Sequence, residues 1–414
     1  MKKSIATFLV LVPALLCAQN LKELIDLAQK HNDLVTAKKY NEASKAQALD
    51  SQKSSYYPTV DIGGFYKRDD AATPFQAGDI YSAFAKVGFD IYDGGKRSAL
   101  VDEKAQTLQS AAFETTAYKK SLALGITQDF FAIKSLQASL NAREEAQKTL
   151  KAQLEKITKF YEAKMATIDD VQRVQADYDT NIYNIETIKF DILSLKSKLE
   201  LTTGAKIKSF EATAFKKEEN ENFATLENIQ AIIAQKNAIN AASNAVDSFY
   251  YPNIRIEDTF SVYGYDRLDP QTKALANPLD NQNKIMLTVN MRLFDFGQIS
   301  SSKEAVRLNA KVLNAQINYQ TKEQQTEYEL AKARIATAKL KILSAKSALN
   351  AAKSAFHTIE KKYNAGIVDY IIYLDALTKK TSSKALYESS LNDLEVAYAT
   401  YYYYSGKNIQ EEIK

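Results

Sequence analysis

The sequence predicts a mainly α-helical chain with a smaller β portion, built from two tandem repeats of a two-stranded hairpin followed by long coiled-coil helices. Three observations support this prediction. The 414 residues include only 12 Gly and 6 Pro, and long stretches contain neither. Segments of about ten residues with alternating apolar side chains occur in pairs, which is typical of half-buried strands. The same succession of turns and helix ends occurs twice along the chain.

The repeat is defined by matching residues at a constant spacing. Tyr56-Tyr57-Pro58 recurs as Tyr250-Tyr251-Pro252, which is 194 residues later, and beyond this point the spacing becomes 202. The larger spacing relates Asp93 to Asp295, Gly95 to Gly297, Tyr161 to Tyr363 and Gly204 to Gly406. In both copies the Asp and the Tyr are 68 positions apart. We therefore expect a duplication with two long helices of equal length.

The N-terminal residues 1–18 are predicted to be a signal peptide. Lys2 and Lys3 precede an apolar stretch, Ile5 to Cys17, that is too short to span a bilayer. Cleavage after Ala18 would remove Cys17, whereas lipidation would make Cys17 the first residue of a lipoprotein. No later stretch reaches 18 apolar residues, so no transmembrane helix is expected. The net charge of +4 does not indicate a nucleic-acid partner.

Repeat 1 is predicted to occupy residues 19–204. An amphipathic helix should run from Leu21 to about Ser54, because the Tyr-Tyr-Pro that follows disfavours helical backbone. The remaining elements are strands at about 59–67 and 80–92, a long helix at about 96–162 and a return helix at about 169–201.

The linker at residues 205–224 is rich in Lys and Glu and is predicted to be a surface connection, with room for a short strand. Repeat 2 should occupy residues 225–406 and begin with a helix near Leu226. Its further elements are strands at about 253–265 and 284–294, a long helix at about 298–363 and a return helix at about 369–404. Residues 407–414 form a charged C-terminal tail.

Strands of this length with one apolar face match the pattern of an outer-membrane barrel. The residues expected to face lipid in the second strand of each hairpin are Val87, Phe89 and Ile91, and Leu287, Val289 and Met291. Four strands cannot close a barrel, and lipid does not tolerate an open sheet edge. Several copies of the chain must therefore share one barrel, and three copies would supply twelve strands.

The turns and helix tips carry a family resemblance. Asp93-Gly94-Gly95 and Asp295-Phe296-Gly297 follow the hairpins, and the tips read Tyr161–Gln172 and Tyr363–Ala376. This ordered set, from Leu21 to Gly406, resembles the TolC-type outer-membrane efflux family. The resemblance implies a homotrimer with a twelve-stranded outer-membrane barrel continued by a periplasmic α-helical tunnel. It also implies two partners, a periplasmic adaptor (membrane fusion protein) and an inner-membrane transporter.

Several positions depart from the family pattern. Asn32-Asp33 replaces an Asn-Pro pair, and Lys164 stands where the first tip usually has Gly. In the second tip, Val368 replaces an Arg, and Ile372 replaces the first of two pore-facing Asp residues. The acidic ring that the family resemblance implies would then be single rather than double.

The candidate residues for the tunnel entrance and its gating are Asp375, Asp369, Asp170 and Tyr363. Asp170 follows Thr167 by three residues, the spacing of a capping box, and Asp369 is placed to cap the return helix. Asp375 lies too deep in that helix for capping, so it either faces the pore or belongs to a solvated helix face. Tyr363 aligns with a family tyrosine that helps to hold the entrance shut, or is a seam residue.

The residue inventory argues against an enzyme. The two histidines, His31 and His357, are far apart in sequence, and no catalytic, cofactor or metal site is expected. Gly94-Gly95-Lys96 lacks the rest of a phosphate-loop pattern. Two functions remain: a passive outer-membrane exit duct, and an exported coiled-coil scaffold or adaptor without a barrel. The four membrane-length strands favour the duct, while the substrate, the transporter and the resting state of the tunnel are left open.

Overall fold

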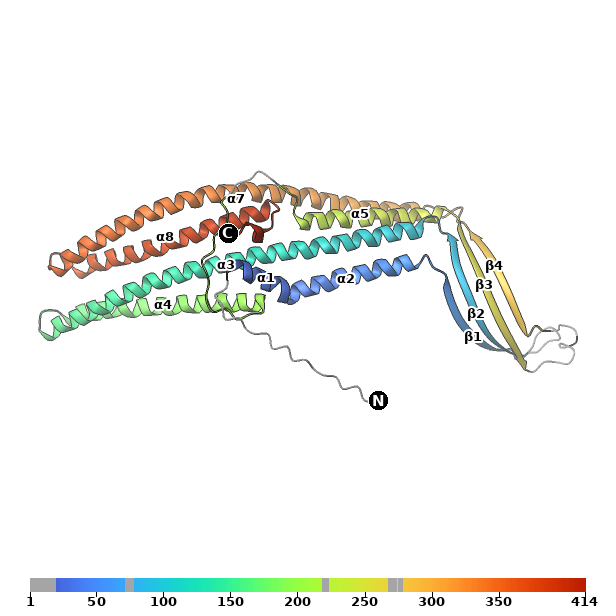
Figure 1. Ribbon diagram of the computed structural model, residues 1–414, viewed down its shortest axis with the longest axis horizontal. Helices are drawn as coiled ribbons and strands as arrows, with labels where there is room; N and C mark the ends of the chain where they lie inside the picture. Colours follow the sequence, from blue (N-terminus) through green and yellow to red (C-terminus); the bar gives the residue numbers. More distant parts are fainter. Residues whose placement is uncertain (1–19, 71–77, 218–222, 267–273, 275–277) are drawn as a thin grey trace. The chain divides into compact units, whose positions relative to one another are not determined.

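The computed structural model describes residues 20–70, 78–217, 223–266, 274 and 278–414 (Figure 1). The predicted signal peptide, residues 1–18, and with it Cys17, lies outside the described residues. The helices are α1 (Leu21–His31), α2 (Asp33–Ser54), α3 (Lys96–Glu162), α4 (Ile168–Thr203), α5 (Glu227–Asp247), η1 (Ser248–Tyr250), α7 (Gln298–Asn364), α8 (Tyr370–Tyr404) and η2 (Ile409–Glu412). The strands are β1 (Thr59–Arg68), β2 (Asp79–Tyr92), β3 (Asn253–Asp266) and β4 (Asn281–Asn290).

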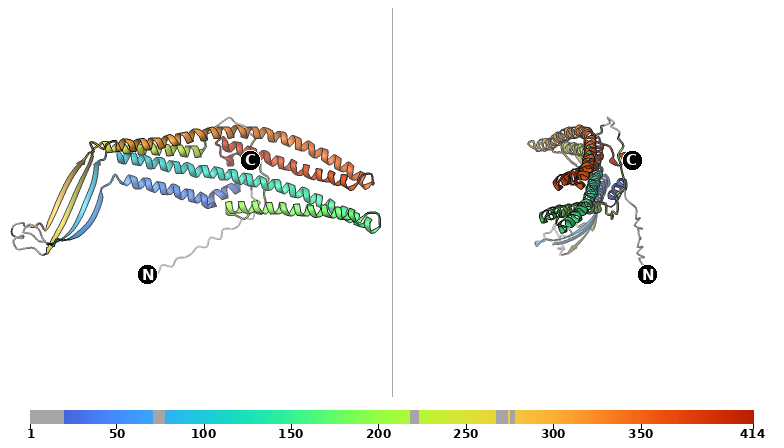
Figure 2. Two further views of the ribbon diagram at one scale, coloured as in Figure 1. Left: turned by 180° about the vertical axis from the view of Figure 1, so that it is seen from behind. Right: turned by 90° about the vertical axis from the view of Figure 1, so that its left-hand side faces the viewer.

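The chain forms two compact units. Unit 1 comprises Met1–Ala37, Thr115–Glu227 and Thr321–Lys414, and unit 2 comprises Lys38–Glu114 and Asn228–Gln320. Unit 2 contains the sheet, whereas unit 1 contains two helical hairpins, formed by α4 with the part of α3 from Thr115 onward and by α8 with the part of α7 from Thr321 onward. Within unit 1 the two helices of each hairpin lie side by side in all views (Figures 1 and 2).

The sheet of unit 2 is antiparallel with strand order β1-β2-β3-β4, so β1 and β4 are its edges. The register places Ile62 opposite Ala85, Phe89 opposite Ile256 and Leu287 opposite Ile256. Because successive side chains of a strand point to opposite faces, this register gathers the apolar residues of all four strands on one face. Its members away from the loop end are Val60, Ile62, Ala85, Val87, Phe89, Ile254, Ile256, Phe260, Leu287 and Val289.

The opposite face of the sheet, called the polar face, carries most of the charged residues of the strands, together with Phe65, Phe84 and Met286. Lys86, Arg255 and Glu257 lie on it and form ion pairs with one another or with Asp90. Away from the loop end, Asp258 is the one charged residue of the described strands that shares the apolar face, where it stands opposite Val87 and Ile285.

The position of β4 differs from the prediction of residues 284–294, because the strand spans Asn281–Asn290. The alternating pattern continues to residue 294, but β3 begins at Asn253, which pairs with Asn290. Residues beyond Asn290 therefore have no described partner in the ladder, and Met291 lies outside the strand. Leu287, rather than Val289, is nearer the middle of β4.

The two exits from the sheet into the long helices share one hydrogen-bonding pattern. Asp93 Oδ1 accepts from Gly95 N (3.2 Å), and Asp295 Oδ1 accepts from Gly297 N (3.0 Å). The second oxygen of each Asp accepts from the backbone N–H two residues further on, in the first turn of α3 and α7. The middle residue of each turn has positive φ, 67° at Gly94 and 54° at Phe296. Only Gly94 is crowded, whereas Phe296 is 92% exposed.

The long helices α3 and α7 each contain 67 residues, and the predicted equal length is therefore confirmed. Equal length is what a duplication requires, while the duplication itself stays a prediction. The first helix was expected to be continuous, and this prediction is wrong, because the helix is interrupted at Asn32. The Asn32 side chain accepts from the N–H groups of Leu34 and Val35 and donates to the carbonyl of Thr202. Asn32 thus caps α2 and ties it to the end of α4.

Unit 1 has an aromatic core at the level where α8 ends. Tyr398, Tyr401 and Tyr402 are buried in it together with Phe130 of α3. Residues 205–217, named the strap, were expected to be a surface connection, but Ile207 and Phe215 are fully buried. Phe215 forms a β-bridge with Ile413, and the C-terminal tail is packed here rather than solvated. The short strand that the linker could hold is thus a single bridge.

The helices α3 and α8 are also joined by ion pairs. Glu145 of α3 accepts hydrogen bonds from Lys380 (2.9 Å) and Lys384 (2.5 Å) of α8. The bond from Lys380 and then that from Lys384 lower the pKa of Glu145 to about 2. The carboxylate is 44% exposed, so solvent screens the pair substantially.

We predict that Gly94→Ala destabilises unit 2 more than Gly95→Ala does. Both glycines have positive φ, so each alanine should cost about 1–2 kcal/mol of stability. A Cβ at position 94 would also lie 2.6 Å from the carbonyl oxygen of Ser248, whereas a Cβ at position 95 meets nothing within 4 Å. Thermal unfolding of the purified variants would measure the difference. Equal losses would show that the crowding at Gly94 is unimportant.

We also predict a pH-dependent effect of Glu145→Gln. A lowered pKa contributes stability above the ordinary value of 4.5, and this contribution disappears as the pH falls from 4.5 toward 2. The variant should therefore be less stable at pH 7, by at most about 1 kcal/mol because the pair is partly exposed, and equal to the wild type near pH 2. Chemical unfolding at both pH values tests this, with Glu144→Gln as the control. A deficit that persists at pH 2 would mean that Glu145 acts through packing.

Candidate functional site

The candidate residues lie at the tips of the two helical hairpins, both within unit 1. At the first tip, Lys164 N donates to Tyr161 O (2.9 Å) and Met165 N donates to Phe160 O (2.7 Å). The second tip repeats this pattern 202 residues later, with Gly366 N to Tyr363 O (3.0 Å) and Ile367 N to Lys362 O (2.8 Å). These paired bonds are those of a helix end that closes on a left-handed residue.

Lys164 adopts the left-handed backbone that Gly366 adopts at the other tip, with φ of 62° and 73°. A side chain in this region costs about 1–2 kcal/mol, which glycine avoids. The replacement of the usual family glycine by Lys164 therefore keeps the turn and adds a positive charge at the tip.

Asp170 and Asp369 are engaged in helix caps. Asp170 accepts from the backbone N and the hydroxyl of Thr167, while Asp170 N donates to that hydroxyl, which completes a capping box. The backbone bond from Thr167, followed by the hydroxyl bond, lowers the pKa of Asp170. Asp369 Oδ1 accepts from Ile372 N (3.0 Å) at the start of α8. Capping thus accounts for the positions of both carboxylates.

Asp375 is exposed on α8, and no described group lies within hydrogen-bonding or ion-pairing distance of its carboxylate. It occupies the solvent side of a helix whose other side is buried, since Tyr373 and Ala376 pack in the hydrophobic cluster of the tips. Ile372 is also largely exposed. Among the candidate carboxylates of the described chain, Asp375 is the one that no intramolecular bond explains.

Tyr363 is part of a group of tyrosines that the sequence analysis did not assemble. Its ring stacks on Tyr373 at a centroid distance of 4.7 Å, and Lys156 lies 5.2 Å from the same centroid. Burial, followed by the charge of Asp170, raises the pKa of Tyr363. Lys156 Nζ also donates to Asn364 Oδ1 (3.2 Å), so the ends of α3 and α7 lie close together.

Two further tyrosines connect α8 to the other hairpin. The hydroxyl of Tyr370 donates to Asp177 of α4 (3.2 Å), and Gln153 of α3 donates to the hydroxyl of Tyr373 (3.5 Å). Burial raises the pKa of Tyr370 strongly and that of Tyr373 to about 12. Both phenols are therefore neutral near pH 7. Tyr370 and Tyr373 are three residues apart within α8, and this spacing was the sequence signal that could have placed them on one helix face.

The site is suited to binding and positioning rather than to catalysis. Within the described residues, no three His, Cys, Asp or Glu side chains are grouped closely enough to hold a metal ion. The same part of the chain has no helix that is both long and apolar enough to cross a membrane. The phenols titrate far above neutrality, and two of the carboxylates are held in caps, so none is poised for proton transfer.

The comparisons with known proteins all find outer membrane proteins. The profile of the family described as "Outer membrane efflux protein" matches residues 24–204. Outer membrane protein TolC of Salmonella enteritidis is 21% identical over 408 residues, covering 92% of this chain and 82% of that protein. The fold is similar to that of the outer membrane protein VceC of Vibrio cholerae, with a TM-score of 0.81, 14% identity, and coverage of 94% and 96% of the two chains.

A second solved structure, the CmeC outer membrane channel of Campylobacter jejuni, gives a TM-score of 0.82 at 14% identity. It covers 93% of this chain and 85% of that chain. Taken together with the family profile and the TolC relative, these likenesses agree with the resemblance that the turns and tips indicated. The chain thus matches the outer membrane efflux protein family over residues 24–204 and is similar to TolC over most of its length, and the relatives and solved structures that it resembles are outer membrane proteins.

Proposed function

We propose that the protein is the outer-membrane exit duct of a tripartite efflux or type I secretion system. In this role a homotrimer conducts substrates passively from an inner-membrane transporter, reached through a periplasmic adaptor, to the exterior. The observation that carries the proposal is the sheet of unit 2, which joins one continuous apolar face to two open edges.

The apolar face has the dimensions of a membrane layer. The β1–β2 ladder pairs ten residues, from Thr59 to Arg68, which is about 33 Å of strand. A tilt of about 45° reduces this to roughly 25 Å, the height of the lipid-facing band of a barrel. Aromatic side chains stand at its loop end, where Tyr66 and Tyr81 stack and donate to Asp79 and Asp266. Tyrosines are favoured where one end of the ring is apolar and the other is wet.

The open edges require further copies of the chain. In lipid, each unpaired N–H or C=O group costs several kcal/mol, so β1 and β4 cannot remain edges within the membrane. Pairing β4 of one copy with β1 of the next satisfies both edges with one kind of contact. Three copies would close a twelve-stranded barrel wide enough for a channel. A soluble coiled-coil scaffold would have no use for such a sheet.

The tips of the helical hairpins supply the proposed entrance. The exposed, unpartnered carboxylate of Asp375 would approach its two symmetry copies near a threefold axis. Like charges at short distance repel one another, and a cation relieves this repulsion. With Ile372 in place of a second acidic residue, the ring would be single.

The proposal is tested by locating the protein and measuring its conductance. The mature chain should appear in the outer-membrane fraction, migrate on gels as a trimer unless it is heated, and form channels in planar bilayers. A soluble periplasmic product with no channel activity would exclude the duct and favour the scaffold.

We predict that Leu287→Arg destabilises the assembled protein by about 2–4 kcal/mol, the cost of an arginine near the middle of the lipid-facing surface. Met286→Arg is the matched control, because Met286 is the preceding residue of β4, lies on the polar face and stands opposite Glu257. Denaturant unfolding of protein folded into lipid vesicles would report both values. Equal losses would contradict the assignment of the lipid-facing side.

We further predict that Asp375→Asn weakens the cation selectivity of the channel and its block by divalent cations in planar bilayers. Asp369→Asn serves as the control, because its side chain is held in a cap; this substitution should change both stability and selectivity little, since Asn caps a helix as well as Asp does. If Asp369→Asn or Asp170→Asn removes the selectivity and Asp375→Asn does not, the acidic ring lies elsewhere.

A further inference from the structure

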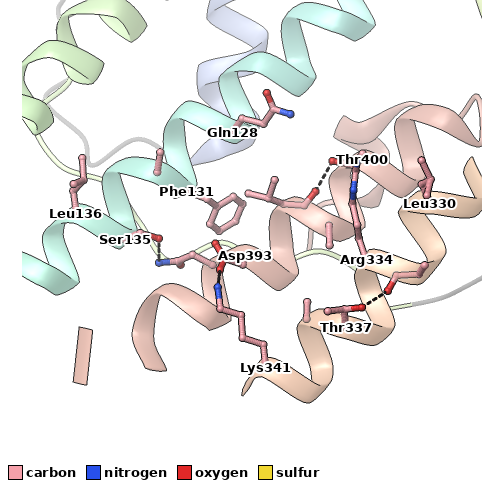
Figure 3. A pocket seen from close by; sticks show the side chains of 16 residues that line it. Gln128, Phe131, Ser135, Leu136, Leu330, Arg334, Thr337, Lys341, Asp393 and Thr400 are labelled. Atoms are coloured by element: carbon pink, nitrogen blue, oxygen red, sulfur yellow. Dashed lines mark hydrogen bonds and ion pairs between the residues drawn. The ribbon is translucent and has the colours of Figure 1, made fainter. Parts of the chain in front are cut away.

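A groove of about 900 Å³ lies within unit 1, between α3, α7 and α8 (Figure 3). The three helices leave this space because small residues occupy the positions where they face one another, among them Ala132, Ala333 and Ala397. Apolar side chains, Phe131 and Leu330, contribute to its walls. The volume is within the range of sites that hold a drug-sized molecule.

The two cationic side chains of the groove differ in how closely they are paired with a carboxylate. Lys341 is paired with Asp393 at 2.7 Å across the groove. Arg334 forms an ion pair with Glu327, which lies outside the groove. The guanidinium nitrogen and the carboxylate oxygen are 3.8 Å apart, which is beyond hydrogen-bonding distance. The lining residues therefore include two cations against one carboxylate. The guanidinium of Arg334 keeps most of its five donors available for an incoming anion.

The groove opens on the side of α8 that faces away from the strap. Glu395 of α8 accepts from Phe215 N of the strap at 2.7 Å, and Tyr402 donates to the carbonyl of Lys216. Val396 and Thr400 line the groove. At 100° per residue, these two pairs are centred about 130° apart around the helix axis, so the strap contacts and the groove lie on different sides of α8.

In the proposed duct, this orientation determines whether the groove opens to the inside or to the outside. Three straps, each with α1 and the packed C-terminal tail, would obstruct a duct that they faced. The strap side must then be the outside, and the groove must open into the passage.

We propose that this groove is a binding site inside the duct for a small amphipathic acid, a molecule with an aromatic or alicyclic body and one anionic group. The body would lie against Phe131 and Leu330, and the anion would accept hydrogen bonds from Arg334. A helix from a second copy is the other occupant of such a groove, and the test below distinguishes it from a small molecule. The proposal rests on the proposed function and adds a substrate class to it.

The test uses the full mature trimer in lipid nanodiscs and two dyes that share one framework. 8-Anilinonaphthalene-1-sulfonate carries an anionic group, whereas N-phenyl-1-naphthylamine lacks it. We expect Arg334→Gln to weaken binding of the sulfonate about tenfold, as befits the loss of a charge-assisted hydrogen bond, and to leave the neutral dye unaffected. Thr337→Phe, which fills the groove from an exposed position of its wall, should weaken both dyes. Fluorescence titration, corrected with empty nanodiscs, provides the dissociation constants.

Arg307→Gln is the matched control, because Arg307 lies on the same helix, outside the groove, and has a similarly distant partner, Glu304 at 4.0 Å. It should change neither dye. If Arg334→Gln and Thr337→Phe leave both dissociation constants unchanged, or if Arg334→Gln affects the two dyes equally, the proposed anion site is wrong. If neither dye binds and Thr337→Phe dissociates the trimer, a neighbouring copy fills the groove and the proposal is also wrong.

Channel conductance of the same preparation separates this inference from the proposed function. If the trimer conducts ions but dye binding does not depend on the groove, only the proposed binding site is excluded. If the trimer does not conduct ions, the proposed duct is excluded, and so is the role of the groove as a site for substrates in transit.

Discussion

A backbone N–H or C=O group in lipid must be hydrogen-bonded, and the sheet of this chain cannot meet that requirement by itself. Its strand order leaves one edge of β1 and one edge of β4 unpaired, although the apolar face continues out to both strands. In the proposed duct, the ladder geometry would therefore couple folding in the membrane to association of the copies. The equal lengths of α3 and α7 follow from the same requirement in the proposed trimer, because helices that leave one ring must reach their tips at a common level.

The hairpin tips are stabilised by contacts that differ from those expected of the family. An arginine is absent from the second tip, where Val368 stands instead. The two hairpins are joined by phenol groups, with Tyr370 bonded to Asp177 and Tyr373 to Gln153. A hydrogen bond from a neutral phenol is weaker than a bidentate ion pair and less sensitive to salt. At the tips, the link between the hairpins thus depends on packing and burial more than on charge, whereas the ion pairs of Glu145 join α3 and α8 further from the tips.

Local sequence signals predicted most of the elements, because they depend on local physics. The absence of Gly and Pro located α7 to within one residue of its observed end, and the Thr167–Asp170 spacing identified a capping box that the structure contains. The errors arose where a distant partner decides the outcome. The end of β4 depends on where β3 begins, the break at Asn32 depends on the carbonyl of Thr202, and the burial of Phe215 depends on Ile413. The tyrosine link between hairpins was missed for the same reason.

The candidate carboxylates show how far such reasoning reaches for a site. Capping is a local interaction, so its geometry could be anticipated for Asp170 and Asp369 and accounts for both. Asp375 was singled out because no local interaction explains it, and the structure leaves it exposed without a bond to any described group. A charged residue on a helix surface ordinarily needs no partner, since water solvates it. Its significance depends on what faces it in the assembly, and a threefold axis would turn three ordinary surface carboxylates into one mutually repelling cluster whose charge a bound cation can offset.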